Sequence, residues 1–394
     1  MLIYFIMDWY TLSAVIFTLM LVIIFYKDRK NVKREFILFL RKTQRGKGFI
    51  IRVGTRFNRF WTWIGTIAVI VGFIASIWII YLLIVQTQLL LTKQIEMGPG
   101  VLIPSFSQKT IIGPGYYAVP FWYWIISIAV LTVVHEGFHG IIAASQKIRI
   151  KSLGWGLLAV IPLAFVEPDE KQLKRQKTWK QLRVFAAGSF ANFVTSYVFL
   201  GILILLTSTM FIPAGVSYQA LMKDYPAAEV NLTGIIVRIE NYTIRDLNDL
   251  NYALTSIGPN KTITVFTRVV NETSVEEKRF VLTTTVSPEN KSKGFIGISG
   301  VFTYTELKDE FTPFKDIIYF FTGSPFSLGL LAWISLINFF VGLFNLLPIG
   351  MLDGGRMWEI VLKRFFPKKY KKLMNVIGTF LLLIIVFDFV LTLT

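Results

Sequence analysis

The chain contains 394 residues, of which 54% are hydrophobic and 16% charged, and its formal net charge is +17. This composition excludes an ordinary soluble domain, and the lack of cysteine excludes disulfides and thiolate metal ligands. The basic excess is concentrated in loops between apolar segments, so we expect a lipid bilayer around the chain and no nucleic-acid partner.

Six apolar segments recur along the chain, each long enough to cross a bilayer. The first has neither a basic start nor a small-residue cleavage site, so we expect a retained membrane anchor and not a signal peptide. The sequence therefore predicts a polytopic α-helical membrane protein with about six spans, at roughly 4–26, 61–91, 119–146, 183–211, 325–347 and 373–393.

Three of the connecting segments are strongly basic. The segment 27–59 carries twelve Lys or Arg against two acidic residues, 147–183 carries nine against three, and 363–372 adds six basic residues. Basic loops mark the cytoplasmic side of a membrane. We therefore expect a multi-pass protein of the cell membrane whose N-terminus and whose segments 92–118 and 212–324 are extracytoplasmic.

The third span contains the only two histidines of the chain, His135 and His139. Four residues apart on a helix is about one turn, so both imidazoles lie on one face and can reach the same ion. Glu136 lies about 100° round the helix from His135, where it can act on a water held by that ion. The run His135-Glu136-Gly137-Phe138-His139 therefore predicts a metalloenzyme whose metal site lies inside a membrane-spanning segment.

The segment 212–324 is the one long polar stretch and has the pattern of a small α/β module. Asp246 can cap a helix that ends at Gly258. Strand-like runs occur at 234–240, 262–268 and 280–286. Five glycosylation sequons are confined to this segment, at Asn231, Asn241, Asn260, Asn271 and Asn290. Sequons are used outside the cytoplasm, so their position favours the same topology.

A catalytic zinc site needs three protein ligands and one open position, so a third ligand must come from elsewhere in the chain. Asp353 follows a long apolar segment, and Pro348 and two glycines near it can break the helix and turn the carboxylate inward. Ionisable groups at membrane depth are costly and usually functional. Asp388 lies near the external end of the last span, where we expect an interfacial, solvated carboxylate.

These residues resemble the signature of the site-2 protease family of intramembrane zinc metalloproteases: the His135-Glu136-x-x-His139 run in one span and Leu352-Asp353-Gly354-Gly355 after a later one. The resemblance covers roughly 120–394 and is that of a PDZ-containing member, with an archaeal source expected. Further similar stretches are 164–170, which looks like the segment following the family's membrane-re-entrant hairpin, 186–193, which is similar to its Gly-Pro-x-x-Asn stretch, and 226–234 and 294–298, which look like parts of its PDZ domain.

The resemblance implies one zinc ion per chain, held by His135, His139 and Asp353, with Glu136 as the general base. It also implies that Asn192 orients the substrate or stabilises the developing oxyanion. A hydrogen bond between packed helices is the alternative role for Asn192.

The implied fold is that of a polytopic helical membrane protein with a re-entrant hairpin and an inserted extracytoplasmic PDZ-like α/β domain. Ser189 and Met351 stand where the family usually has proline, and neither change removes a reactive group. The implied domains are an N-terminal membrane region with two spans and a basic cytoplasmic loop at 1–118, a first catalytic half at 119–211, the PDZ-like domain at 212–324 and a second catalytic half at 325–394.

The activity implied by the resemblance is hydrolysis of peptide bonds within or near the transmembrane segments of membrane-anchored proteins that retain a short external stub, as in regulated intramembrane proteolysis. Two other classes of function fit the spans: a metal carrier or sensor with the same ligands, and an adaptor whose PDZ-like module binds external peptides. A carrier needs no base beside its ligands, and an adaptor leaves the buried His-Glu-His group without a purpose.

Overall fold

A computed structural model describes residues 9–35, 38–95, 98–158, 161–270, 275–288 and 290–393. The predicted sequon at Asn271 lies outside these residues. The chain forms two compact units: one comprises Met1–Leu203 and Ser327–Thr394, and the other comprises Ile204–Phe326.

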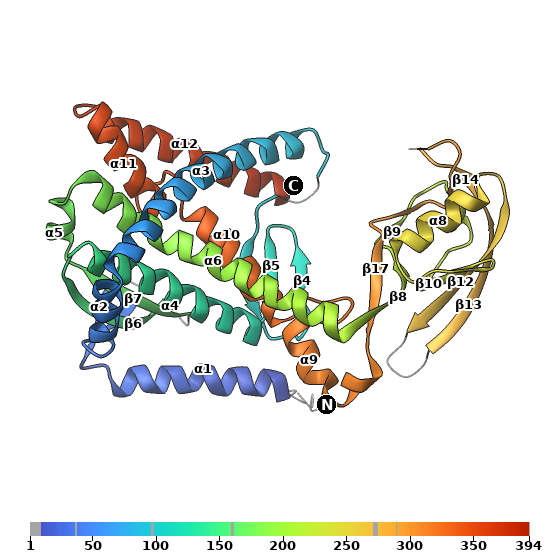
Figure 1. Ribbon diagram of the computed structural model, residues 1–394, viewed down its shortest axis with the longest axis horizontal. Helices are drawn as coiled ribbons and strands as arrows, with labels where there is room; N and C mark the ends of the chain where they lie inside the picture. Colours follow the sequence, from blue (N-terminus) through green and yellow to red (C-terminus); the bar gives the residue numbers. More distant parts are fainter. Residues whose placement is uncertain are drawn as a thin grey trace, which may run out of the picture. The chain divides into compact units, whose positions relative to one another are not determined.

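The first unit is mainly helical (Figure 1). Its helices are α1 (Trp9–Lys27), α2 (Lys47–Arg56), α3 (Asn58–Leu91), α4 (Phe121–Ser145), α5 (Glu170–Lys174), α6 (Thr178–Met210), α10 (Leu330–Phe344), α11 (Asp353–Phe365) and α12 (Tyr370–Leu393). Buried apolar side chains of α3, α6, α10 and α11 form one core cluster, and those of α4, α6 and the strand that follows α4 form another. The helix α6 thus contributes to both clusters.

Within the described residues, five helices are long and apolar enough to cross a membrane, namely α1, α3, α4, α6 and α12. They correspond to five of the six predicted spans, and the chain is a membrane protein. The predicted span 325–347 instead contains α10, which has 15 residues. A helix of that length rises about 22 Å, which is short of the hydrocarbon core of about 30 Å.

A four-stranded antiparallel sheet lies beside α4 in the first unit. Its order is β1 (Val32–Glu35), β2 (Leu38–Thr43), β6 (Ile150–Leu158) and β7 (Ile161–Pro168), so β7 is an edge strand, and it packs along α4. A second sheet, of β3 (Val101–Ser105), β5 (Tyr116–Pro120) and β4 (Ile111–Gly113), precedes α4.

The hairpin of β6 and β7 corrects one detail of the sequence analysis. The segment from Lys151 to Pro162 is strand on both sides of residues 159–160, which lie outside the described residues. Its glycines serve close packing, because a Cβ on Gly154 would lie 2.1 Å from the Phe165 ring. The stretch from 164 to 168 lies inside β7 and does not follow the hairpin.

Asp388 is not the solvated interfacial carboxylate that the sequence analysis expected. The residue is fully buried on α12, and Thr87 Oγ1 on α3 donates a hydrogen bond of 3.0 Å to its Oδ2. One turn later, Thr392 Oγ1 accepts a bond of 2.9 Å from the backbone N–H of Gly98. The carboxylate is buried because α12 turns this face toward α3 and the segment after α3 closes over it.

The second unit contains a mixed set of short strands and helices. Its main sheet has the order β13-β12-β10-β8-β17, with β11 paired to β10. The strands are β8 (Phe211–Ser217), β9 (Ala220–Leu221), β10 (Ile235–Ile239), β11 (Tyr242–Thr243), β12 (Thr262–Val270), β13 (Val275–Thr283), β14 (Thr285–Val286), β15 (Gly294–Phe295), β16 (Ile298–Ser299) and β17 (Phe302–Leu307). The helices are α7 (Pro226–Glu229), α8 (Leu247–Ile257), the 3-10 helix Asp309–Phe314 and α9 (Lys315–Thr322).

The α/β pattern predicted for this segment is confirmed. Asp246 caps α8 through a hydrogen bond of 2.9 Å from the Asp249 N–H to its side chain, and Gly258, with φ 76°, ends the helix. The first and last strands of the sheet segment, β8 and β17, pair with each other, and Ser217 lies opposite Phe302. The chain therefore enters and leaves the main sheet of this unit along one antiparallel ribbon.

Candidate metal centre

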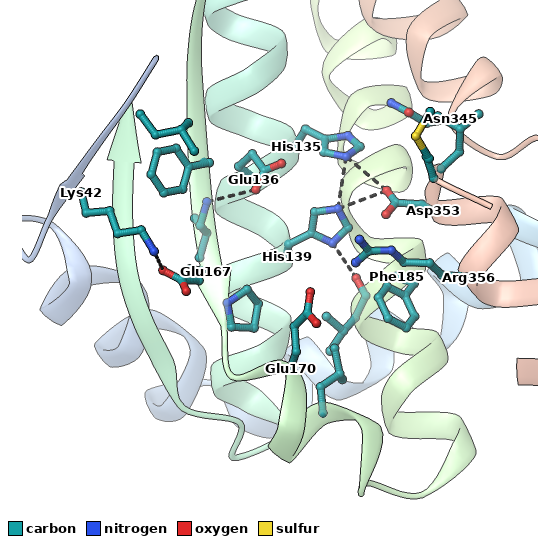
Figure 2. Close-up of a pocket in the computed structure, with 18 residues that line it drawn as sticks. Lys42, His135, Glu136, His139, Glu167, Glu170, Phe185, Asn345, Asp353 and Arg356 are labelled. Carbon is teal, nitrogen blue, oxygen red and sulfur yellow. Dashed lines mark hydrogen bonds and ion pairs between the residues drawn. The ribbon is translucent and has the colours of Figure 1, made fainter. Parts of the chain in front are cut away.

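Two histidines and one aspartate converge inside the first unit (Figure 2). His135 and His139 lie one turn apart on α4, and their Nε2 atoms are 3.1 Å apart. Asp353 Oδ2 lies 3.2 Å from His135 Nε2 and 3.1 Å from His139 Nε2. The structure therefore brings together the three residues that the resemblance named as metal ligands.

The position of Asp353 is set by the glycines that follow it. Asp353 is the first residue of α11, a separate helix, and is not part of the preceding apolar helix. The Gly354 N–H donates to the Asn345 carbonyl at 2.9 Å, and a Cβ on Gly354 would lie 2.0 Å from the Leu346 carbonyl oxygen. A residue without a Cβ is needed for α11 to begin this close to the segment after α10. The close packing directs the Asp353 carboxylate toward α4.

The donor atoms have the spacing that a tetrahedral zinc ion requires. Zinc binds imidazole nitrogen and carboxylate oxygen at about 2.0–2.2 Å, so tetrahedral ligand atoms lie about 3.3 Å apart. The three separations here are 3.1, 3.1 and 3.2 Å. Two nitrogens and one oxygen are also a donor set typical of catalytic zinc, with a fourth position left open. The residues present therefore fit the ion.

Gly188 on α6 keeps the place of the ion free. A Cβ built on Gly188 would lie 2.5 Å from His139 Nε2 and 2.6 Å from His135 Nε2. These distances are close to a metal–ligand bond, so a methyl group would stand where the ion belongs. The missing side chain at this position is a second observation in favour of a metal site.

The outer nitrogens of both imidazoles are held as well. His139 Nδ1–H donates to the Val184 carbonyl at 2.6 Å, which leaves the lone pair of a neutral ring on Nε2. The Asn192 amide lies 3.0 Å from His135 Nδ1. When His135 binds a metal through Nε2, its Nδ1–H donates, and a 180° rotation of the amide presents the Asn192 oxygen as acceptor. Such partners fix the ring orientation and tautomer of metal-binding histidines.

The burial of Asn192 bears on the two roles considered for it. The residue is fully buried on α6, and the described residues that line the cavity beside the metal-binding group do not include it. Its hydrogen bond joins α6 to α4, as the helix-packing alternative supposed, but ends on His135 itself. The geometry supports a residue that holds a metal ligand in place.

Glu136 lines a cavity of about 520 Å³ together with the three metal-binding residues. Its Oε2 accepts a hydrogen bond of 3.0 Å from the backbone N–H of Val166 on β7. One turn earlier on α4, Thr132 Oγ1 accepts a bond of 3.3 Å from the Ala164 N–H. Four residues rise about 6 Å along a helix and two residues about 6.6 Å along a strand. Because these two distances are nearly equal, both hydrogen bonds can form at once, and they hold the edge strand β7 in register with α4.

Charged side chains from other elements also line the cavity. Lys42 Nζ on β2 lies 2.6 Å from Glu167 Oε2 on β7, and Ser152 Oγ donates to the same oxygen at 2.5 Å. These hydrogen bonds, with that of Lys42 the stronger influence, hold the pKa of the Glu167 carboxyl below its usual value. Arg356 on α11 lines the cavity too, and Figure 2 shows its side chain reaching toward His139.

Three residues of this geometry received no role in the sequence analysis: Gly188, Thr132 and Arg356. Gly188 carried a usable signal, because a glycine inside an apolar helix indicates a close approach by another group. Arg356 also carried one, since it follows Asp353 by three residues and so shares a helix face with it. Thr132 carried none, because its partner is a backbone group of a strand remote in sequence.

The sequence matches peptidase family M50 across residues 123–385. It is 26% identical over 352 residues to an uncharacterized protein of Methanocaldococcus jannaschii, which covers 89% of this chain and 83% of that protein. Proteins named "Putative zinc metalloprotease" in Staphylococcus aureus are 27% identical over 252 residues (strain COL) and 25% identical over 260 residues (strain N315). Those two matches cover 53% of this chain, which spans 57% of the length of each. The matched region contains His135, Glu136, His139, Asn192 and Asp353, and the chain belongs to peptidase family M50, the site-2 protease family.

Proposed function

We propose that this protein is an intramembrane zinc metalloprotease that holds one zinc ion per chain and cuts membrane-anchored proteins within or near their transmembrane segments. The observation that carries the proposal is the group of His135, His139 and Asp353 with Glu136 beside it in one cavity. These residues lie on or against helices long enough to cross a bilayer. Because the chain belongs to a peptidase family, hydrolysis of a peptide bond is the reaction to expect at this group.

Each residue of the site has a part in hydrolysis. When bound, zinc lowers the pKa of water and polarises a carbonyl group. Glu136 takes a proton from the attacking water and delivers it to the nitrogen that leaves. Asn192 and the Val184 carbonyl hold the two imidazoles through their outer nitrogens, at 3.0 and 2.6 Å. Burial of the group between α4, α6 and α11 limits water to the lined cavity.

The second unit is proposed to be an extracytoplasmic PDZ-like domain that selects substrates with short external stubs. It contains no member of the metal-binding group, all of which lie in the first unit. Its described sequon asparagines are all exposed, at positions 231, 241, 260 and 290. A PDZ-like module binds peptides as an added strand, which suits a short stub and disfavours a large folded ectodomain.

Purified protein in liposomes, incubated with a single-span test protein, tests the proposed activity. The wild type should cut the substrate, a zinc chelator should stop it, and added zinc should restore it. His139→Ala should lose both zinc and cleavage, whereas Glu136→Gln should keep one zinc per chain and lose cleavage. Cleavage by the Glu136→Gln protein, or cleavage that no chelator affects, would remove the basis of the proposal.

The proposed topology can be tested because the chain has no cysteine, so a single introduced cysteine is a unique label. Lys171 and Lys291 are both exposed in the structure. An impermeant maleimide applied to intact cells should label Lys291→Cys and spare Lys171→Cys until the cells are permeabilised. The reverse pattern would place the second unit in the cytoplasm.

A further inference from the structure

Arg356 is a cation that lines the cavity and has no part in the mechanism proposed above. Arg356 follows Asp353 by three residues on α11, so both lie on one face of the helix, about one turn apart. Arg356 lines the same cavity as Asp353 and Glu136, and in Figure 2 its guanidinium reaches toward His139. The first turn of α11 packs closely against the segment after α10 and so positions the Asp353 carboxylate. The same packing positions the backbone from which the Arg356 side chain extends.

Arg356 differs from the other cation of the cavity in its contacts. Lys42 already forms an ion pair, because its Nζ lies 2.6 Å from Glu167 Oε2. Among the described residues, no carboxylate oxygen lies within 4.0 Å of the Arg356 guanidinium. Its Cζ instead lies 5.4 Å from the ring centre of Phe185 on α6. Contact with an aromatic face steadies a guanidinium while leaving its N–H edge free to donate.

Peptide hydrolysis is accelerated by a hydrogen-bond donor that stabilises the negative oxygen of the reacting peptide. When the water oxygen bonds to the carbonyl carbon, the π electron pair of the C=O bond moves onto oxygen, and Glu136 takes the water's proton. When the adduct collapses, that pair reforms the C=O bond, the C–N bond breaks, and the proton passes from Glu136 to the leaving nitrogen. Between these events the substrate oxygen carries a negative charge, and a donor already in place lowers the barrier.

Each other donor near the site is buried away from the cavity, has a partner, or, like the Asn345 amide that also lines the cavity, carries no charge. The Asn192 amide is fully buried and does not line the cavity. The Val166 N–H on the edge strand is bonded to Glu136. We propose that Arg356 is a catalytic residue that donates to the carbonyl oxygen of the scissile peptide as this oxygen becomes negative. The inference rests on the proposed protease function and adds a group that acts in its transition state.

The test compares Arg356→Met with Arg364→Met; both arginines are exposed and lie on the same helix, but Arg364 does not line the cavity. With a single-span substrate in liposomes, Arg356→Met should lower kcat by about 100- to 1,000-fold, the usual effect of removing an oxyanion donor. Its KM and its zinc content should stay within about twofold of the wild type, and Arg364→Met should match the wild type. Arg356→Lys keeps the charge without the planar fork and should recover part of kcat.

A phosphinic peptide of the substrate sequence gives a second measurement, because its tetrahedral oxygens imitate the adduct. Arg356→Met should weaken its inhibition by about the factor lost in kcat/KM. Binding of the intact substrate, measured in a Glu136→Gln background, should not change. An unchanged kcat, or a raised KM with kcat unchanged, overturns the inference, the latter because it would show binding to the ground state. Cleavage by the wild type separates that result from failure of the proposed function, in which the wild type cuts nothing.

Discussion

Replacement of Gly188 by alanine should strongly weaken zinc binding while leaving the helices folded. The new Cβ would lie 2.5 Å from His139 Nε2 and 2.6 Å from His135 Nε2, whereas ordinary contact begins at 3.4 Å. Each imidazole would have to retreat by about 0.8–0.9 Å, and functional metal–ligand distances tolerate about 0.2 Å. Neither ring is free to retreat, because the outer nitrogen of each is bonded to α6.

The expected loss of zinc affinity is at least about 100-fold, which is the upper end of the effect of removing a group that supports a ligand. Gly201→Ala on the same helix is the matched control, since a Cβ there would meet nothing within 4 Å. Both substitutions gain about the same helix propensity, up to about 1 kcal/mol. A difference between them therefore reports on the site and not on the helix.

Zinc content by mass spectrometry and zinc affinity by competition with a chromogenic chelator would measure the effect. Circular dichroism and gel filtration should show the same fold for both variants. If Gly188→Ala keeps one zinc per chain with the affinity of the Gly201→Ala protein, the ion does not bind where the three donors converge, and the assignment of the site is wrong.

Three further predictions follow from the geometry. Asn192→Ala should weaken zinc binding by about 10- to 100-fold, whereas Asn338→Ala, which removes an equally buried amide bonded only within α10, should leave it unchanged; equal affinities in the two variants would contradict the positioning role. Because the pKa of Glu167 lies below its ordinary value of 4.5, the stability gained from its bond to Lys42 is present above about pH 4.5 and is lost as the pH falls through the lower folded value. Thermal midpoints of wild type and Lys42→Met should therefore differ at pH 7 and converge in acid, and a constant difference would argue against the bond. Replacing residues 218–301 by a two-residue Asn-Gly turn should keep zinc and cleavage of short-stub substrates, since positions 217 and 302 face each other across a strand pair, but should admit bulky ectodomains; a folded, zinc-bound protein that cuts nothing would give the second unit a direct catalytic role.

Local spacing was sufficient to predict the α4 part of the site, because two histidines four residues apart on a helix must share a face. The approach of Asp353 was predicted only in outline. The sequence shows that Pro348 and the glycines break the helix, but not that α11 begins against the carbonyl groups of the preceding segment. The burial of Asp388 could not be predicted, because it depends on which face α12 turns toward α3.

Contacts with backbone groups account for most of what the sequence did not reveal. The Val184 carbonyl that holds His139 and the N–H groups of β7 that bind α4 are present in every residue type, so nothing in the sequence marks them. Their positions follow from how α6 and the hairpin pack on α4. Long-range packing of this kind is specified by the whole chain and not by a motif.

The hydrogen bond between Glu136 and the Val166 N–H has a practical consequence for anyone wishing to trap a substrate. Substitution of Glu136 by alanine would remove the general base and also the acceptor of the Val166 N–H on the edge strand. The strand β7 would then lose one of the two hydrogen bonds to α4 described above. If a peptide failed to bind such a variant, this result would say little about binding to the unaltered cavity. Glutamine keeps an oxygen in the same place and cannot take a proton from water. Glu136→Gln is therefore the variant in which a captured peptide should lie as it does before it is cut.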